Sequence, residues 1–159
     1  MLDLGINLVD LALWLADYPK VVSVSTQNYH HHSRNLEDTS LSFIRCENSI
    51  LISIEASWTL AEERDAFNAN IYGTKGSVAA NPFKLIKSLE DEQIDLGSTF
   101  LETPTEAFKK SYLNEIKSFI GAIRGLNPVF SSGEEALQLL KIAEAMYKSA
   151  EEEKEIKIS

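Results

Sequence analysis

The chain has 159 residues, a length typical of one domain and sufficient to bury a core without disulfides or a structural metal. Its net charge of −9 disfavours nucleic acid and anionic membrane surfaces as partners. No apolar run is long enough to span a bilayer, and we expect no signal peptide. The single cysteine, Cys46, fits a reducing cytoplasm, where we expect it to be a small half-buried apolar residue.

The first predicted element is a buried helix over residues 4–17, which Tyr18-Pro19 ends because proline cannot continue a helix. The chain opens directly inside this helical pattern, as expected of a piece of a longer protein. The alternating stretch KVVSVSTQNYHHH, residues 20–32, then predicts a strand, and residues 38–47 and 49–58 predict two more, joined by a turn at Glu47-Asn48. The third strand has two different faces: an apolar one with Ile50, Ile52, Ile54, Ala56 and Trp58, and a wetter one with Leu51, Ser53, Glu55 and Ser57.

The middle of the chain reads as further antiparallel strands. AFNANIY, residues 66–72, predicts a fourth strand, and GTKG, residues 73–76, predicts a tight turn into residues 77–80. Asn81-Pro82 breaks the pattern, and residues 83–89 and 93–96 predict a hairpin around EDE.

The last third is helical. An apolar stripe of period 3.6 predicts a helix that Gly125 and Pro128 end; its members are Tyr112, Ile116, Phe119, Ile120 and Ile123. A second helix starts at SSGEE, residues 131–135, with Ser131 or Ser132 as cap and Glu134 or Glu135 completing a capping box. Its predicted apolar stripe is Ala136, Leu140, Ala143, Tyr147 and Ala150. EIKIS closes the chain as a short strand. This order predicts an α+β fold, with an open, mostly antiparallel sheet and helices packed on one face.

Few residues outside the first helix suggest chemistry. No glycine pattern forms a dinucleotide or phosphate loop. His30, His31 and His32 follow one another at a strand end, so at most two share a side, and a zinc site needs three or four ligands. Glu37 or Asp38 could add an oxygen, but a solvated strand end explains the histidines better, and we expect no metal.

The opening stretch DLGINLVDLALWL, residues 3–15, keeps three polar side chains in an apolar helix. Asp3, Asn7 and Asp10 are spaced i, i+4 and i+7, on one helix face. One interpretation is structural: Asp3 favours the helix N-terminus, and the other two bond to neighbouring loops. The other interpretation is functional, with the helix turning these groups toward a ligand that compensates for their burial. The pattern alone leaves both open.

The same stretch resembles the D-x-G-x-H-x-x-D-x-x-x-W-L segment that opens the C-terminal domain of the glucose–fructose oxidoreductase / inositol dehydrogenase (Gfo/Idh/MocA) family. PKVVSVS, EDTSLSF, the strand ending in SW, IYGTKGSV and the final helix pair with its strand are similar to that domain in the same order. The resemblance covers nearly the whole chain. It implies a single C-terminal substrate-binding and oligomerisation domain over residues 1–159, resembling the C-terminal domain of glyceraldehyde-3-phosphate dehydrogenase, with the N-terminal Rossmann domain absent from this chain.

The resemblance also implies an activity for the full-length protein. Members oxidise sugars, polyols and related hydroxy compounds with NAD or NADP. The Rossmann domain binds this cofactor and also carries a catalytic lysine. We therefore expect no cofactor on this chain alone and no activity from it in isolation. We also expect a cytoplasmic location and a small-molecule substrate. The missing Rossmann domain is an expected partner. A homo-oligomer, most simply a dimer, is expected to form through the open face of the sheet.

One substitution separates this chain from the family pattern. Asp3 matches the aspartate of the motif and Asp10 its second aspartate, but Asn7 stands where the family has its histidine. An amide can hydrogen-bond a hydroxyl but cannot act as a general base. By the resemblance Asp3 and Asn7 occupy the catalytic positions, and Asp3, Asn7 and Asp10 the substrate-binding ones. The alternative hypothesis is a stand-alone, non-catalytic sugar-binding or assembly module.

Overall fold

The computed structural model describes residues 2–61, 63, 66–80, 83–89, 92–97 and 104–158. By its internal contacts the chain divides into two compact units, residues 1–61 with 131–159 and residues 62–130. The α+β class with antiparallel strands is confirmed, although the described strands form two four-stranded sheets, one in each unit, and not one continuous sheet. Within the described ranges, no helix combines the length and the apolar character needed to cross a membrane.

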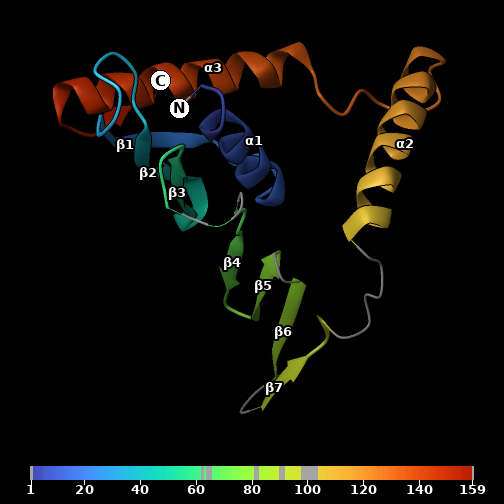
Figure 1. Cartoon of the computed structure of the whole chain (residues 1–159). Helices are drawn as coiled ribbons and strands as arrows, with labels where there is room; N and C mark the ends of the chain where they lie inside the picture. The colour runs from blue at the N-terminus through green and yellow to red at the C-terminus, as the bar shows by residue number, and fades with distance from the viewer. Residues whose placement is uncertain are drawn as a thin grey trace. The chain divides into compact units, whose positions relative to one another are not determined.

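The first unit contains a sheet with two helices on one face. Its strands are β1 (Val21–Tyr29), β2 (Thr39–Cys46), β3 (Leu51–Ser57) and β8 (Ile156–Lys157), in the order β3-β2-β1-β8 and all antiparallel. Helix α3 (Gly133–Glu152) packs along β1, and α1 (Gly5–Leu15) packs on β3 and on α3 (Figure 1). A single 3₁₀ turn, Glu47–Ser49, joins β2 to β3 where the sequence predicts a turn.

The core lies between this sheet and the two helices. Val24 and Ile44 at its centre are fully buried, as is Met146 of α3. The complete cluster is Val9, Leu13, Val21, Val24, Ile44, Cys46, Ile52, Ile54, Ile142 and Met146. On α3 the buried stripe contains Ile142, Ala143, Met146 and Ser149, so the predicted members Ala136 and Leu140 lie outside the core. Burial raises the pKa of the Cys46 thiol, as expected of a structural cysteine.

The opposite face of the sheet is open. Leu51, Ser53 and Glu55 of β3 are exposed, whereas Ile52 and Ile54 are buried, so the predicted division of this strand into two faces is confirmed. On β1 the alternation fails at one point: the register shifts between Val21 and Ser23, and the adjacent residues Ser23 and Val24 are both buried. A bulge of this kind re-aims the side chains that follow it.

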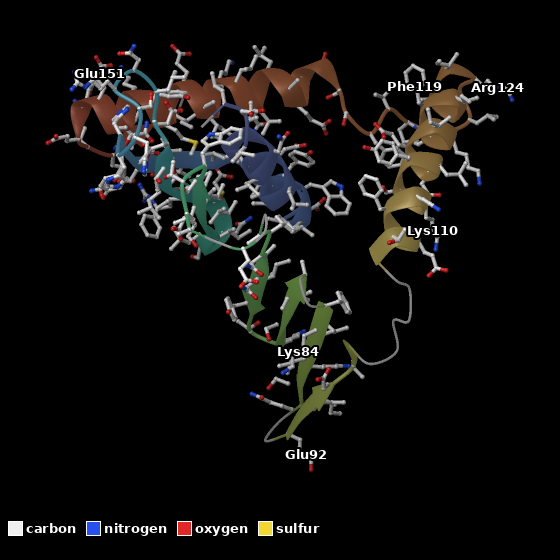
Figure 2. The ribbon with its side chains drawn as sticks, viewed as in Figure 1. Lys84, Glu92, Lys110, Phe119, Arg124 and Glu151 are labelled. Atoms are coloured by element: carbon white, nitrogen blue, oxygen red, sulfur yellow. The ribbon has the colours of Figure 1, made fainter. Side chains whose placement is uncertain are left out.

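The second unit holds a second antiparallel sheet and one helix. Strands β4 (Asn70–Gly73), β5 (Gly76–Ala80), β6 (Phe83–Leu89) and β7 (Glu92–Asp95) pair in sequence order. Lys84 on β6 and Glu92 on β7 are labelled in Figure 2. A Cβ at Gly76 would lie 2.2 Å from the Ile86 carbonyl oxygen, so the β4–β5 turn requires glycine there. Asn81-Pro82 and most of EDE lie outside the described residues.

The two C-terminal helices begin and end at the signals in the sequence. Helix α2 (Pro104–Ile123) carries the predicted stripe that includes Phe119 (Figure 2), and it ends at Gly125, whose φ is +69°. Helix α3 starts with a complete capping box: Glu135 N–H donates to Ser132 Oγ at 3.2 Å, and Ser132 N–H donates to Glu135 Oε2 at 2.8 Å.

We predict that Leu13→Ala destabilises the first unit by about 2–5 kcal/mol, because a fully buried side chain is lost from under the sheet. Leu15→Ala removes the same atoms from a side chain that is 42% exposed on the same helix, and we expect a loss under about 1 kcal/mol. Urea unfolding followed by the fluorescence of Trp14 and Trp58, both in this unit, measures the difference. Equal losses would contradict the assigned core.

Candidate functional site

The first two polar positions of the opening segment lie together at the N-terminal end of α1. Asn7 Nδ2 donates a hydrogen bond of 2.8 Å to the carbonyl oxygen of Asp3, and both side chains are exposed. The helix itself starts at Gly5, with Leu4 as its N-cap residue, so Asp3 precedes the helix and its side chain does not cap it. Both side chains therefore remain accessible to solvent at the start of the helix.

The third polar position is engaged differently. Asp10 is half-buried, and its Oδ1 accepts a 2.9 Å hydrogen bond from the Tyr18 hydroxyl. Burial, followed by this bond to Asp10, raises the pKa of Tyr18 to about 12. The phenol therefore stays protonated and remains a donor at neutral pH. Asp10 therefore already has a hydrogen-bond partner, Tyr18, within the first unit.

Next to Asp3, a shallow depression extends from the start of α1 across the ends of β2 and β3. Its lining residues are Leu4, Glu37, Asp38, Thr39, Ser40, Ala56 and Trp58. Trp58 is 58% exposed and presents a large apolar surface at the rim. Its backbone N–H donates to the Asp38 carbonyl oxygen at 2.9 Å, which ties the rim to the floor. The depression is too tight to hold a ligand, and Asp38 and Ser40 within it are buried, so the exposed face of Trp58 is the surface that it offers to a ligand.

Asp38 forms the floor of this depression. Its Oδ2 accepts hydrogen bonds from the backbone N–H groups of His32, at 2.6 Å, and Ser33, at 3.4 Å. The bond from His32 does most to hold the pKa of Asp38 below its ordinary value. Within the described part of the chain, Asp38 Oδ1 and Ser40 Oγ are buried without a hydrogen-bond partner. The carboxylate thus anchors the loop that carries the three histidines.

Tyr147 of α3 connects the start of the chain to the entrance of β2. Its hydroxyl donates to Glu37 Oε1 and accepts a 3.4 Å bond from Leu2 N–H. Burial, with the bond to Glu37, raises the pKa of Tyr147 to about 12. Burial alone would raise the pKa of Glu37, but its hydrogen bonds, including that from Tyr147, hold the pKa below its ordinary value. Leu2, the residue before Asp3, is therefore held in place by Tyr147 of α3.

The triple histidine lies in the loop after β1. His31 stacks on Tyr29 with ring centroids 5.9 Å apart and an interplanar angle of 5°. Among the residues that the structure describes, no three His, Cys, Asp or Glu side chains come together as metal ligands would. The observed contacts are those of a loop anchored by Asp38.

The structure thus brings Asp3 and Asn7 together, and it adds residues that the sequence did not single out as ligand-facing. Glu37, Asp38, Trp58 and Tyr147 come from three elements that are distant in sequence. The sequence did carry a signal for these residues. Glu37 and Asp38 stand immediately before β2, and Trp58 follows β3, the strand that pairs with β2.

Residues 1–158 match the family model described as the C-terminal alpha/beta domain of an oxidoreductase family, that of Gfo/Idh/MocA proteins. The chain therefore belongs to the Gfo/Idh/MocA oxidoreductase family and represents its C-terminal domain. The resemblance seen in the opening motif is confirmed.

Curated relatives come from two bacteria. A myo-inositol 2-dehydrogenase of Thermotoga maritima is 32% identical over 122 residues, which are 76% of this chain and 36% of that protein. A D-glucoside 3-dehydrogenase of Escherichia coli is 20% identical over 95% of this chain and 46% of its own length. The chain thus spans less than half the length of the curated relatives it matches.

Solved structures of similar fold include a levoglucosan dehydrogenase in complex with NADH and L-sorbose. It has a TM-score of 0.81 and 17% identity over 99% of this chain and 49% of its own. An oxidoreductase from Agrobacterium radiobacter, in complex with NAD⁺, L-tartaric acid and magnesium, has a TM-score of 0.78 and 17% identity, with 98% and 48% coverage. At such identities the likeness concerns the fold.

We predict that Asp38→Asn lowers the urea midpoint of the first unit at pH 7. Because the pKa of Asp38 is lowered on folding, its charge contributes stability above the unfolded pKa, and this contribution disappears as the pH falls through the folded pKa. The difference in urea midpoint between the wild type and the variant should therefore shrink below about pH 4. Glu151→Gln, at an exposed position on α3 (Figure 2), is the control. A gap independent of pH would show that the charge is not the cause.

Proposed function

We propose that this chain is the substrate-binding and oligomerisation part of an NAD(P)-dependent oxidoreductase that acts on a sugar, a polyol or a related hydroxy compound. The observation that carries the proposal is the pair Asp3 and Asn7: both side chains are exposed, Asn7 Nδ2 donates to the Asp3 carbonyl oxygen, and Leu4, next to Asp3 in the chain, lines the Trp58 depression. Membership of the family and the dehydrogenase names of the relatives support it.

In this proposal the chain recognises hydroxyl groups. The Asp3 carboxylate accepts a hydrogen bond from a substrate hydroxyl, and the Asn7 amide donates to or accepts from the next one. Trp58 covers the apolar side of the ring. Asn7 does not titrate, so it positions the reacting hydroxyl without removing its proton.

The nicotinamide cofactor belongs to the N-terminal Rossmann domain in this proposal. Every strand pairing in the described part of the chain is antiparallel, so these residues do not form the parallel βαβ unit that cradles a dinucleotide. NAD or NADP would supply hydride transfer when bound to that domain. The isolated chain is expected to be inactive and cytoplasmic.

A second candidate function is a non-catalytic sugar-binding or assembly module, which Asn7 at the family's histidine position favours. The coding DNA directly upstream of the Met1 codon discriminates the two. An in-frame strand, glycine loop and helix would support the oxidoreductase, and an in-frame stop codon would favour the module. Restored dehydrogenase activity after addition of the separately produced Rossmann domain would be the biochemical confirmation.

We predict that Asp3→Ala weakens the binding of myo-inositol to the chain by about tenfold, because a charge-assisted hydrogen bond is lost. Titration of backbone amide NMR signals gives the dissociation constant. Glu151→Ala, on exposed α3, should bind as the wild type does. Equal affinities of Asp3→Ala and wild type would place the ligand elsewhere.

We further propose that the open face of the β3-β2-β1-β8 sheet joins two copies of the chain. Phe43 and Leu51 are 55% and 64% exposed there, next to Ser53 and Glu55, a mixture of polarity that suits a protein–protein interface. The apolar exposure of this face supports a homodimer.

Leu51→Lys should convert the dimer to a monomer, because a lysine ammonium would be buried between two sheets. Sedimentation velocity measures the change. Leu36→Lys places the same charge on a loop residue that is 68% exposed and lies off this face, and it should leave the dimer intact. A Leu51→Lys dimer would refute the proposed interface.

A further inference from the structure

Helix α1 is apolar on nearly every side. Among its eleven residues, Asn7 and Asp10 are the only polar ones. Gly5, Val9 and Leu13 are buried, yet Trp14 and Leu15 remain 60% and 42% exposed. A helix whose other faces are also apolar loses little hydrophobic burial when it rotates about its axis. Burial of Gly5, Val9 and Leu13 therefore sets which face of α1 points inward, but the apolar residues on either side make a small rotation about the axis cost little.

The turn after α1 adopts an uncommon backbone conformation. Asp17 and Tyr18 have φ values of +62° and +47°, the left-handed region that favours glycine. The Tyr18 N–H closes the turn on the Leu13 carbonyl oxygen at 2.7 Å. Such strain persists where surrounding interactions compensate for it.

The strained turn carries the Tyr18 side chain back to the helix. The ring packs against the core cluster, and the hydroxyl reaches Asp10 Oδ1 at 2.9 Å. A hydrogen bond is directional, unlike apolar contact. Asn7 and Asp10 are three residues apart and so lie on the same side of the helix.

We propose that Tyr18 is a positioning residue: by holding Asp10 it sets the rotation of α1 and thereby the direction in which Asp3 and Asn7 face. The importance of that direction rests on the proposed function. Because Asn7 is fixed on the helix, any rotation of α1 about its axis turns the Asn7 side chain by the same angle. Asp10, a substrate-binding candidate by resemblance, becomes the internal anchor of the helix.

Tyr18→Phe tests this inference because it removes the hydroxyl and keeps the ring in the core. We expect the side-chain amide NMR signals of Asn7 and the methyl signals of Val9 and Leu13 to move together, because a rotation carries the whole helix, while the methyl signals of Ile71 and Val78 in the second unit stay in place. Myo-inositol should bind about fivefold more weakly. Tyr29→Phe is the matched control: it removes a hydroxyl that donates to Gln27 Oε1 at 2.8 Å, away from α1.

A double-mutant cycle separates positioning from direct contact with the ligand. If Tyr18 acts through Asp10, Tyr18→Phe, Asp10→Ala and the double variant weaken binding to a similar extent. Asp10→Asn keeps an acceptor oxygen and should retain most of the affinity. If Asp10 itself binds the ligand, Tyr18→Phe releases it and affinity stays equal or rises, which would overturn the proposal.

The Asn7 signals keep this test independent of the proposed function. Failure of the wild-type chain to bind myo-inositol would count against the proposed function, whereas unmoved Asn7 signals in Tyr18→Phe would overturn the positioning role. The two results come from separate measurements on the same samples.

Discussion

The fold of the first unit depends on the covering of the apolar face of its four-stranded sheet. Val24 and Ile44 at the centre of that face are completely buried, and the side chains that cover them come from α1 and α3. These helices lie near opposite ends of the sequence, so burial of one apolar surface brings the two ends of the chain together. The position of Asp3 therefore follows from a contact with a helix more than a hundred residues later.

The same sheet face becomes polar toward the ends of β1 and β2. Thr26 and Ser42 hydrogen-bond each other across the strands, and Thr26 N–H donates to Ser149 Oγ of α3 at 2.9 Å. Further along the same edge, Asp38 holds the histidine loop and Tyr147 holds Glu37. Hydrogen bonds are directional, so the groups that are paired here, unlike the unpaired Asp38 Oδ1 and Ser40 Oγ, order the loops around the depression more strictly than apolar packing would.

Local signals in the sequence predicted the elements well. Periodicity located α2, and the SSGEE segment predicted the capping box that Ser132 and Glu135 form, because both effects act within a few residues. The faces of β3 also followed from alternation alone. The bulge at Val21–Ser23 and the left-handed turn at Asp17-Tyr18 were not predicted. Both depend on partners distant in sequence or across the strands, which a local pattern does not contain.

The site was predicted only in part, for the same reason. Spacing placed Asp3 and Asn7 on one side, and their contact agrees with that spacing. For Asp10 the structural interpretation, a bond to a neighbouring loop, agrees with the structure, but the helical period could not identify Tyr18 of the next turn as the partner. Trp58 and Tyr147 could be joined to the site only through the sheet and α3, which are tertiary features.

The acid–base character of the site agrees with the substitution at Asn7. The carboxylates that line the depression, those of Glu37 and Asp38, both have pKa values below the ordinary range, so they are ionised at neutral pH and are weak bases. Tyr147, with a pKa of about 12, is a weak acid there. These groups are therefore suited to holding hydroxyls and not to exchanging protons with them. In an oxidoreductase of this architecture, the proton of the reacting hydroxyl would then pass to a group of the other domain, and this chain would contribute recognition and orientation.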